Sequence, residues 1–108
     1  MTEAQIEESI LQFLQFSRWL AWKNISGGFW DSSKKCFRKH KSKYVLNGVS
    51  DIIAVKNGRV LFLEVKTKVG KQLDTQIIFE KLLTQHGGEY YIVRSVKDVV
   101  DIISCPRS

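Results

Sequence analysis

The sequence has few of the features that mark secreted or membrane proteins. Its only two cysteines, Cys36 and Cys105, lie far apart and outside any C-x-x-C pair. This excludes the usual zinc-site and disulfide-framework patterns and favours reduced thiols in a cytoplasmic compartment. No apolar run reaches the roughly 18 residues that a membrane-spanning helix needs, and the N-terminal residues are acidic and polar, unlike a signal peptide. We therefore expect a cytoplasmic protein with no membrane partner.

Length and charge narrow the class further. A chain of 108 residues suits a single domain over 1–108, and an apolar fraction of 44% is enough for a globular core. Lysine and arginine outnumber aspartate and glutamate by 17 to 11, which gives a net charge of +6. A surplus of this size in a small domain favours a polyanionic partner, although a merely soluble basic protein would look the same.

The N-terminal third is predicted to be a helix followed by a loop. Thr2 and Gln5 have the spacing of a capping box, and apolar residues then recur at helical spacing. We expect this helix to reach about Trp19 or Trp22. Residues 31–48 show no periodicity and are rich in lysine and arginine, so we predict a basic loop inserted before the first core strand.

The remaining chain alternates between strands and helices. We expect strands over 49–56 and 59–66, a helix over 73–86, a strand over 89–94 and a last helix from 96. The order helix, strand, strand, helix, strand, helix predicts an α/β fold in which helices flank a central sheet. The last strand follows a crossover helix and should run parallel to its neighbour, which makes the sheet mixed.

The hairpin brings two carboxylates together. Asn57-Gly58 is a strong signal for a two-residue turn, and such a turn fixes the register so that Asp51 lies opposite Glu64. Directly opposed residues point to the same face. Because both faces of these strands are apolar, the carboxylates should sit at the end of a buried surface, where two like charges need compensation.

A divalent cation would supply that compensation. Two carboxylates at this spacing are natural oxygen ligands for Mg²⁺ or Mn²⁺. Lys66 lies two residues after Glu64 and therefore on the same face, where its ammonium could orient water or stabilise phosphate charge. A Glu-x-Lys sequence is also common as a solvated ion pair, but the apolar surroundings and the opposed Asp51 favour the catalytic interpretation.

These residues match a known pattern. Gly48-Val49-Ser50-Asp51, then Glu64-Val65-Lys66, then Gln76 on the next helix together resemble the PD-(D/E)XK nuclease superfamily and, more narrowly, the virus-type replication-repair nuclease (VRR-NUC) domain. The resemblance covers most of the chain, from the first helix to about Ile103. The family often has proline before the aspartate, where this chain has Ser50, but that position shapes the turn and is not chemical.

The resemblance implies a PD-(D/E)XK nuclease-like fold and a set of roles. Asp51 and Glu64 would bind the metal, helped by the backbone carbonyl of Val65, Lys66 would be catalytic, and Gln76 would support the site from its helix. Alternatively, Gln76 is an ordinary glutamine at the boundary of the core and has no role in the site.

The family also has an acidic residue on its first helix. We prefer Glu7 as this metal ligand because it lies deeper in the helix, with Glu3 as the alternative. Both residues could instead be ordinary N-terminal helix charges, which the helix dipole favours.

The basic residues would then contact nucleic acid through phosphates, giving affinity without sequence reading. Interleaved aromatic residues, Phe29, Trp30, Phe37 and Tyr44, could pack the loop or stack on bases. A solvated loop is the alternative. The predicted nucleic-acid-binding residues are Lys34, Lys35, Arg38, Lys39, Lys41, Lys43, Lys68 and Lys71.

The expected activity is Mg²⁺-dependent hydrolysis of phosphodiester bonds in branched DNA. Small members of the family resemble archaeal Holliday junction resolvases, which implies a homodimer that cuts four-way DNA and a role in phage or bacterial recombination and DNA repair. Some of Trp19, Trp22, Phe29 and Trp30 could lie in the dimer interface. A monomeric flap- or nick-directed nuclease and a non-catalytic DNA-binding module of the same fold stay open.

Overall fold

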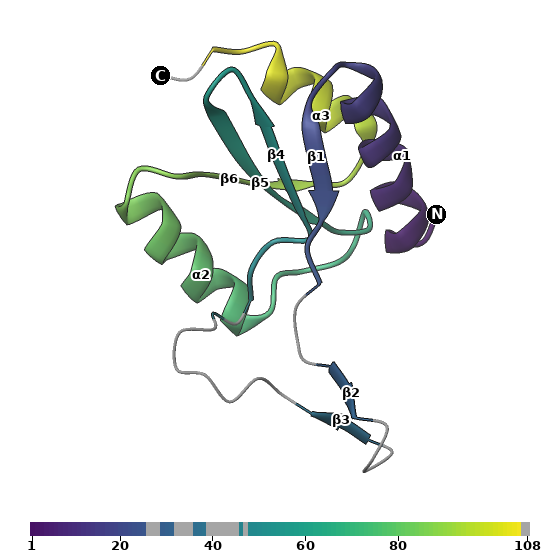
Figure 1. Cartoon of the computed structure of the whole chain (residues 1–108), viewed down its shortest axis with the longest axis vertical. Coiled ribbons are helices and arrows are strands. Elements are labelled where there is room, and N and C mark those ends of the chain that lie inside the picture. The colour runs from purple at the N-terminus through teal and green to yellow at the C-terminus, as the bar shows by residue number, and fades with distance from the viewer. Residues whose placement is uncertain (26–28, 32–35, 39–45, 47, 107–108) are drawn as a thin grey trace.

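The computed structural model describes residues 1–25, 29–31, 36–38, 46 and 48–106, with backbone only for 29–31 and 36–38. Helices lie on both sides of a central sheet (Figure 1). The elements are α1 (Glu3–Phe16), β1 (Leu20–Lys23), β2 (Phe29–Asp31), β3 (Cys36–Arg38), β4 (Ile52–Lys56), β5 (Arg59–Val65), α2 (Asp74–Gln85), β6 (Glu89–Val93) and α3 (Val96–Ile103).

The sheet has four strands in the order β1-β4-β5-β6. β4 runs antiparallel to both β1 and β5, and β6 runs parallel to β5, so the predicted mixed sheet is confirmed. The predicted hairpin register is also confirmed, from Lys56 opposite Arg59 to Ile52 opposite Leu63. Both turn residues have positive φ, 51° at Asn57 and 82° at Gly58, as a primed turn requires.

The two faces of the sheet are covered unequally. α1 and α3 cover one face (Figure 1), where the inward residues of β4 and β5 are fully buried together with Ile10, Leu14 and Val99. α2 covers the other face over β5 and β6, where Phe79 packs 5.9 Å from the ring of Phe62 and 6.1 Å from that of Tyr90.

The prediction for the first helix was wrong at its end. α1 stops at Phe16, and the chain continues into β1, a strand that the sequence reading missed. The helix closes with backbone bonds from Trp19 to Leu14 (2.9 Å) and from Arg18 to Gln15 (3.0 Å), with Arg18 at φ 65°. This is the geometry of a helix end that usually carries glycine. Of the four aromatic residues named as interface candidates, Trp19 is 8% exposed and belongs to the core.

The prediction of an unbroken loop over 31–48 was also wrong in part. β2 and β3 form a short antiparallel pair, with Phe29 opposite Arg38 and Asp31 opposite Cys36. These strands are too short to show a periodicity of two in the sequence. None of the helices in the described part of the chain has the length and apolarity needed to span a membrane.

Candidate active site

Glu64 lies near the end of β5 and is 1% exposed. β5 is a central strand, paired with β4 on one side and β6 on the other, and this position buries the carboxylate. Its Oε1 accepts a 2.5 Å hydrogen bond from Gln76 Nε2 and lies 3.7 Å from Lys66 Nζ. Its Oε2 is fully buried and has no hydrogen-bond partner among the described residues. A buried oxygen without a partner is costly, and such an atom calls for an explanation.

Asp51 lies in the bend that precedes β4 and faces Glu64. Its Oδ2 accepts a 2.9 Å hydrogen bond from the backbone N–H of Val65, and its carbonyl accepts one of 2.7 Å from Asn24. The two carboxyl groups are close enough to share a proton. When both are ionised they are acceptors only and neither can donate. The predicted juxtaposition of Asp51 and Glu64 is therefore present, although Asp51 itself lies just outside the strand ladder.

The electrostatics of this pair favour a cation beside the two carboxyl groups. Burial, reinforced by the charge of Asp51, raises the pKa of Glu64 to about 8. Burial also raises the pKa of Asp51, an effect that the Val65 N–H opposes and the charges of Glu7 and Glu3 reinforce. Both carboxylates are thus destabilised in their ionised forms, and a cation between them would reverse that penalty.

The donor set fits a hard divalent cation. Within the described residues no group of three His, Cys, Asp or Glu side chains is arranged to hold a metal as it stands, and Asp51 and Glu64 are the two carboxylates already brought together. Mg²⁺ is commonly bound in this way, through one or two carboxylates with waters and substrate phosphate oxygens completing the shell. The Oε2 of Glu64, which has no partner among the described residues while both carboxyl groups are ionised, is the atom that such an ion would satisfy.

Lys66 follows directly after β5 and is 8% exposed. Its backbone N–H donates to the carbonyl of Val93 (3.1 Å), which extends the parallel ladder by one residue and fixes where the side chain starts. Arg94 fastens the loop that comes next, donating from Nη1 to the carbonyls of Thr67 (2.5 Å) and Gly70 (2.8 Å). The side chain of Lys66 is thereby held beside Glu64.

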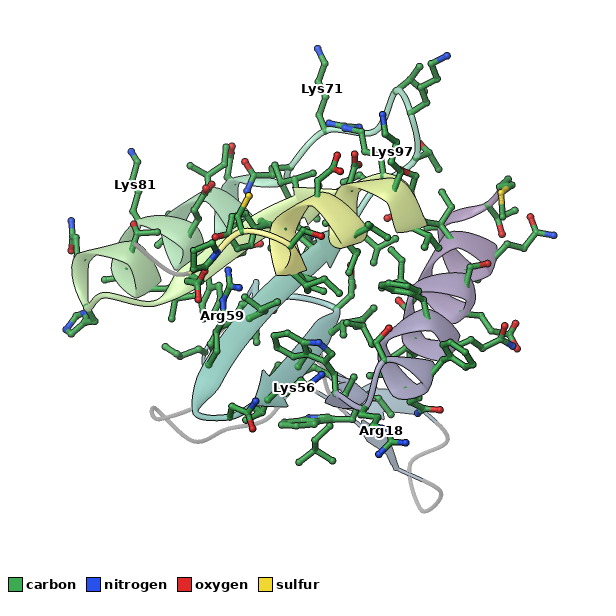
Figure 2. All side chains as sticks on the ribbon, turned by 90° about the horizontal axis from the view of Figure 1, so that it is seen from above. Arg18, Lys56, Arg59, Lys71, Lys81 and Lys97 are labelled. Carbon is green, nitrogen blue, oxygen red and sulfur yellow. The ribbon has the colours of Figure 1, made fainter. Side chains whose placement is uncertain are left out.

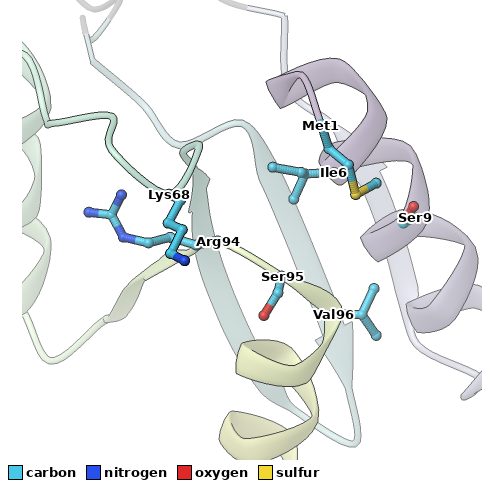
Figure 3. Close-up of a pocket in the computed structure, with 7 residues that line it drawn as sticks. All are labelled: Met1, Ile6, Ser9, Lys68, Arg94, Ser95 and Val96. Atoms are coloured by element: carbon cyan, nitrogen blue, oxygen red, sulfur yellow. The ribbon is translucent and has the colours of Figure 1, made fainter.

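A pocket of about 330 Å³ lies beside this loop. In Figure 3 the guanidinium of Arg94 extends away from α1, toward the loop that it holds. The exposed Lys68 lies on the same loop, two residues from Lys66. The lining residues are Met1, Ile6, Ser9, Lys68, Arg94, Ser95 and Val96.

Gln76 connects α2 to the carboxylates. Its Oε1 accepts from the backbone N–H of Leu73 (2.8 Å), so its Nε2 is the group that faces Glu64. Gly48 lies against the same turn of α2: a Cβ at this position would come within 2.3 Å of the Thr75 carbonyl oxygen, and its φ is +74°. The predicted motif residues Gly48, Asp51, Glu64, Lys66 and Gln76 are therefore brought together.

The first helix contributes Glu7 to the rim of the site. Its carboxylate is 12% exposed and forms a 3.1 Å ion pair with Lys23 of β1. Glu3 is exposed, one turn nearer the N-terminus. Both carboxylates are near enough to raise the pKa of Asp51, with Glu7 the stronger of the two.

The sequence reading missed two groups near the site. Lys23 lies just beyond the helix that we expected to end at about Trp19 or Trp22, and only recognition of β1 could have placed it beside Glu7. The Tyr90 hydroxyl accepts from Gln72 Nε2 (3.2 Å), which also donates to Glu80 (3.1 Å). Burial and the charges of Glu64 and Glu80 raise the pKa of Tyr90 to about 12, partly opposed by the bond from Gln72. The parallel pairing of Tyr90 with Phe62 brings it near Glu64, a register that the sequence does not specify.

The predicted basic residues are described only in part. Lys68 and Lys71 are exposed, and Figure 2 shows Lys71, Lys81 and Lys97 projecting away from the ribbon. By contrast, Lys56 donates to the Ser17 carbonyl (2.9 Å) and Arg59 pairs with Glu89 (2.9 Å). Arg38 lies in β3, where only the backbone is described. The remaining predicted basic residues lie outside the described part of the chain: Lys34, Lys35, Lys39, Lys41 and Lys43.

Comparison with known proteins gives a likeness at the level of structure. No family model and no curated protein matches the sequence. A solved structure described as "VRR_NUC domain" superposes with a TM-score of 0.69 over 99% of this chain and 100% of that chain, at 17% sequence identity. A sequence identity this low supports a shared fold and nothing more specific. The chain thus has the fold of a VRR_NUC domain over nearly its whole length.

Proposed function

We propose that the protein is a metal-dependent nuclease that hydrolyses phosphodiester bonds in DNA. The observation that carries the proposal is the Oε2 atom of Glu64, which is buried and has no partner among the described residues, although Asp51, Gln76 and Lys66 surround its carboxylate. A bound Mg²⁺ or Mn²⁺ would neutralise the carboxylates, activate a water molecule and bind the scissile phosphate.

The contacts of each residue at the site indicate which of its oxygen atoms would bind the metal. Glu64 would offer Oε2 to the ion while Gln76 holds Oε1 in place. Asp51 would offer Oδ1, because Oδ2 is already held by the Val65 N–H. The backbone carbonyl of Val65 and the carboxylate of Glu7 are the further oxygen ligands that we propose, with Glu3 as the alternative acid on α1.

Lys66 would act on the phosphate. Its ammonium lies 3.7 Å from Glu64 and is 10% exposed at the side chain, so it is a largely desolvated positive charge at the edge of the carboxylate pair. Charge that develops on the phosphoryl oxygens during hydrolysis would be stabilised by this ammonium. The same group could hold the attacking water in line.

The net charge of +6 supports DNA as the substrate. Lys68 and Lys71 would extend the basic rim beyond Lys66, and the lysines of the 31–48 segment would add phosphate contacts. We further propose a homodimer that acts on branched DNA, because a twofold dimer presents two active sites in a fixed relation. A flap or nick preference in a monomer is the competing substrate choice.

A cleavage assay tests the proposal. Purified protein is incubated with end-labelled four-way, flap, nicked and linear DNA in Mg²⁺, Mn²⁺ or EDTA. We expect cleavage only with metal and a preference for the four-way substrate. The Asp51→Asn variant should bind DNA but not cut it, whereas Asp101→Asn, an exposed aspartate on α3, should cut like wild type.

Two outcomes would reject parts of the proposal. DNA binding without cleavage in any metal would indicate a non-catalytic binding module of the same fold. Equal cutting of linear and four-way DNA would reject branched DNA as the preferred substrate but would not count against the proposed metal site.

A further inference from the structure

A cation on β1 stands at the rim of the carboxylate site. Lys23 pairs with Ile52 across the β1–β4 ladder, and the next residue, Asn24, donates its backbone N–H to the Asp51 carbonyl at 2.7 Å. The backbone on both sides of Lys23 is therefore fixed against the segment that carries Asp51. The side chain, by contrast, is 59% exposed.

In this structure Lys23 is engaged by Glu7. Its Nζ lies 3.1 Å from Oε1 of Glu7, a carboxylate that is only 12% exposed. Glu7 is in turn close enough to Asp51 for the two charges to repel. Glu7 thus lies between a solvent-exposed cation on one side and the carboxylate of Asp51 on the other.

A divalent ion at Asp51 and Glu64 would change this balance. It would bring a second, stronger positive charge within reach of the Glu7 carboxylate, and that charge would repel the Lys23 ammonium at the same time. If the Glu7 carboxylate turns toward the ion or one of its waters, its 3.1 Å contact with Lys23 weakens. The ammonium, already mostly in solvent, would then be free at the mouth of the site.

We propose that Lys23 binds a DNA phosphate. In the metal-free protein its ammonium is held by Glu7, and metal binding releases it. This inference rests on the proposed metal site and adds a coupling between metal binding and DNA binding that runs through one ion pair. Lys23 would contact a phosphate flanking the scissile one, because it lies at the same end of the sheet as Asp51. Such coupling is reciprocal, so DNA would also tighten metal binding.

The first test is a double-mutant cycle on metal affinity. Mn²⁺ affinity is measured by calorimetry, without DNA, for wild type, Lys23→Gln, Glu7→Gln and the double variant. Lys23→Gln should tighten Mn²⁺ binding by about fivefold in the wild-type background and by less than about twofold when Glu7 is already Gln. An equal gain in both backgrounds would mean only general charge repulsion and would overturn the inference, as would no gain at all.

The second test uses DNA binding with Ca²⁺ or EDTA. Lys23→Gln should reduce the salt dependence of binding by the equivalent of about one phosphate contact in Ca²⁺ and leave it unchanged in EDTA. Lys81→Gln, an exposed lysine on α2 (Figure 2), is the control and should behave alike in both conditions. An effect of Lys23→Gln that is the same with and without Ca²⁺ would contradict the release step.

These experiments separate the two proposals. Wild-type protein that takes up no Mn²⁺ would reject the metal site, and the inference about Lys23 with it. Protein that binds Mn²⁺ through Asp51 and Glu64, but whose affinity ignores the Glu7–Lys23 pair, would reject the inference alone.

Discussion

Glu64 is the most buried charged residue in the described part of the chain, and its two carboxylate oxygens have different surroundings. One is held by Gln76, and the other finds no partner among the described residues. An acid whose pKa rises from 4.5 to about 8 on folding binds its proton more tightly in the folded state than in the unfolded chain. Protonation therefore stabilises the metal-free fold below pH 4.5, and this stabilisation is lost as the pH rises toward 8.

This shift predicts a pH dependence of stability. In EDTA, the free energy of unfolding of wild type should fall between pH 5 and 8 by on the order of a few kcal/mol, since each pKa unit is worth about 1.4 kcal/mol. Glu64→Gln cannot ionise and should flatten the fall, whereas Glu8→Gln, exposed on α1, should keep it. Urea denaturation at a series of pH values measures the slopes, and equal slopes in the two variants would contradict the assignment.

Gln76 is the residue that we expect to position Glu64 for the metal. Removing a side chain that orients a metal ligand typically costs about 10- to 100-fold in metal affinity, so Gln76→Ala should weaken Mn²⁺ binding within that range. Gln85→Ala, at the exposed end of the same helix, is the matched control and should bind normally. Calorimetry provides the measurement. A Gln76→Ala protein that binds Mn²⁺ with wild-type affinity would mean that this glutamine caps the helix and does not position Glu64.

At the scale of elements, the sequence predicts what short-range rules determine. The Asn57-Gly58 turn sets the whole β4–β5 register, because a two-residue hairpin leaves no freedom to slip. Gly87, at φ 83°, closes α2 as expected. Asp51, Glu64 and Lys66 could be brought together from the sequence because all of them depend on that one turn.

The same rules fail where a helix ends without glycine. α1 closes with the backbone bonds that also close α2, but Arg18 takes the left-handed position that Gly87 takes there. Arginine gives no sequence signal for this conformation, and the apolar residues that follow continue the helical spacing. β1 was missed for this reason, and with it the place of Lys23 beside Glu7.

Gly48 is the point where the loop before Asp51 meets α2. Gly48→Ala should lower stability by about 2–3 kcal/mol and weaken Mn²⁺ binding, because the new Cβ would displace the turn that carries Gln76. Gly58→Ala is the control: it has a similar positive φ, +82°, but open space around it, so it should lose only about 1 kcal/mol and bind Mn²⁺ normally. Thermal unfolding and calorimetry measure both variants, and equal losses of metal affinity would contradict this role for Gly48.

At the scale of the whole molecule, the described residues leave one face of the sheet partly uncovered. Leu20 and Trp22 of β1 are 67% and 42% exposed on the face that α2 covers only over β5 and β6. β1 is also one of the two edge strands of this sheet. Aromatic residues are enriched in protein interfaces, so this strand is where we expect the proposed homodimer to make contact.

The dimer gives a direct prediction on mass. Light scattering at micromolar concentration should report twice the 12.5 kDa of one chain, and Trp22→Glu should shift the protein to monomer by placing a charge in the contact. Phe16→Glu, 88% exposed at the end of α1, should remain dimeric. If wild type is a monomer, the proposed homodimer is wrong, and four-way DNA has less support as the substrate.

The central claim is that Asp51 and Glu64 bind a divalent metal, and Mn²⁺ binding followed by electron paramagnetic resonance tests it most directly. Titration of wild type should show Mn²⁺ leaving the free pool. Glu64→Gln should lose more than about tenfold in affinity because it removes a charged ligand, while Glu8→Gln keeps wild-type affinity. If Glu64→Gln binds Mn²⁺ as tightly as Glu8→Gln, the metal is held elsewhere and the account is wrong.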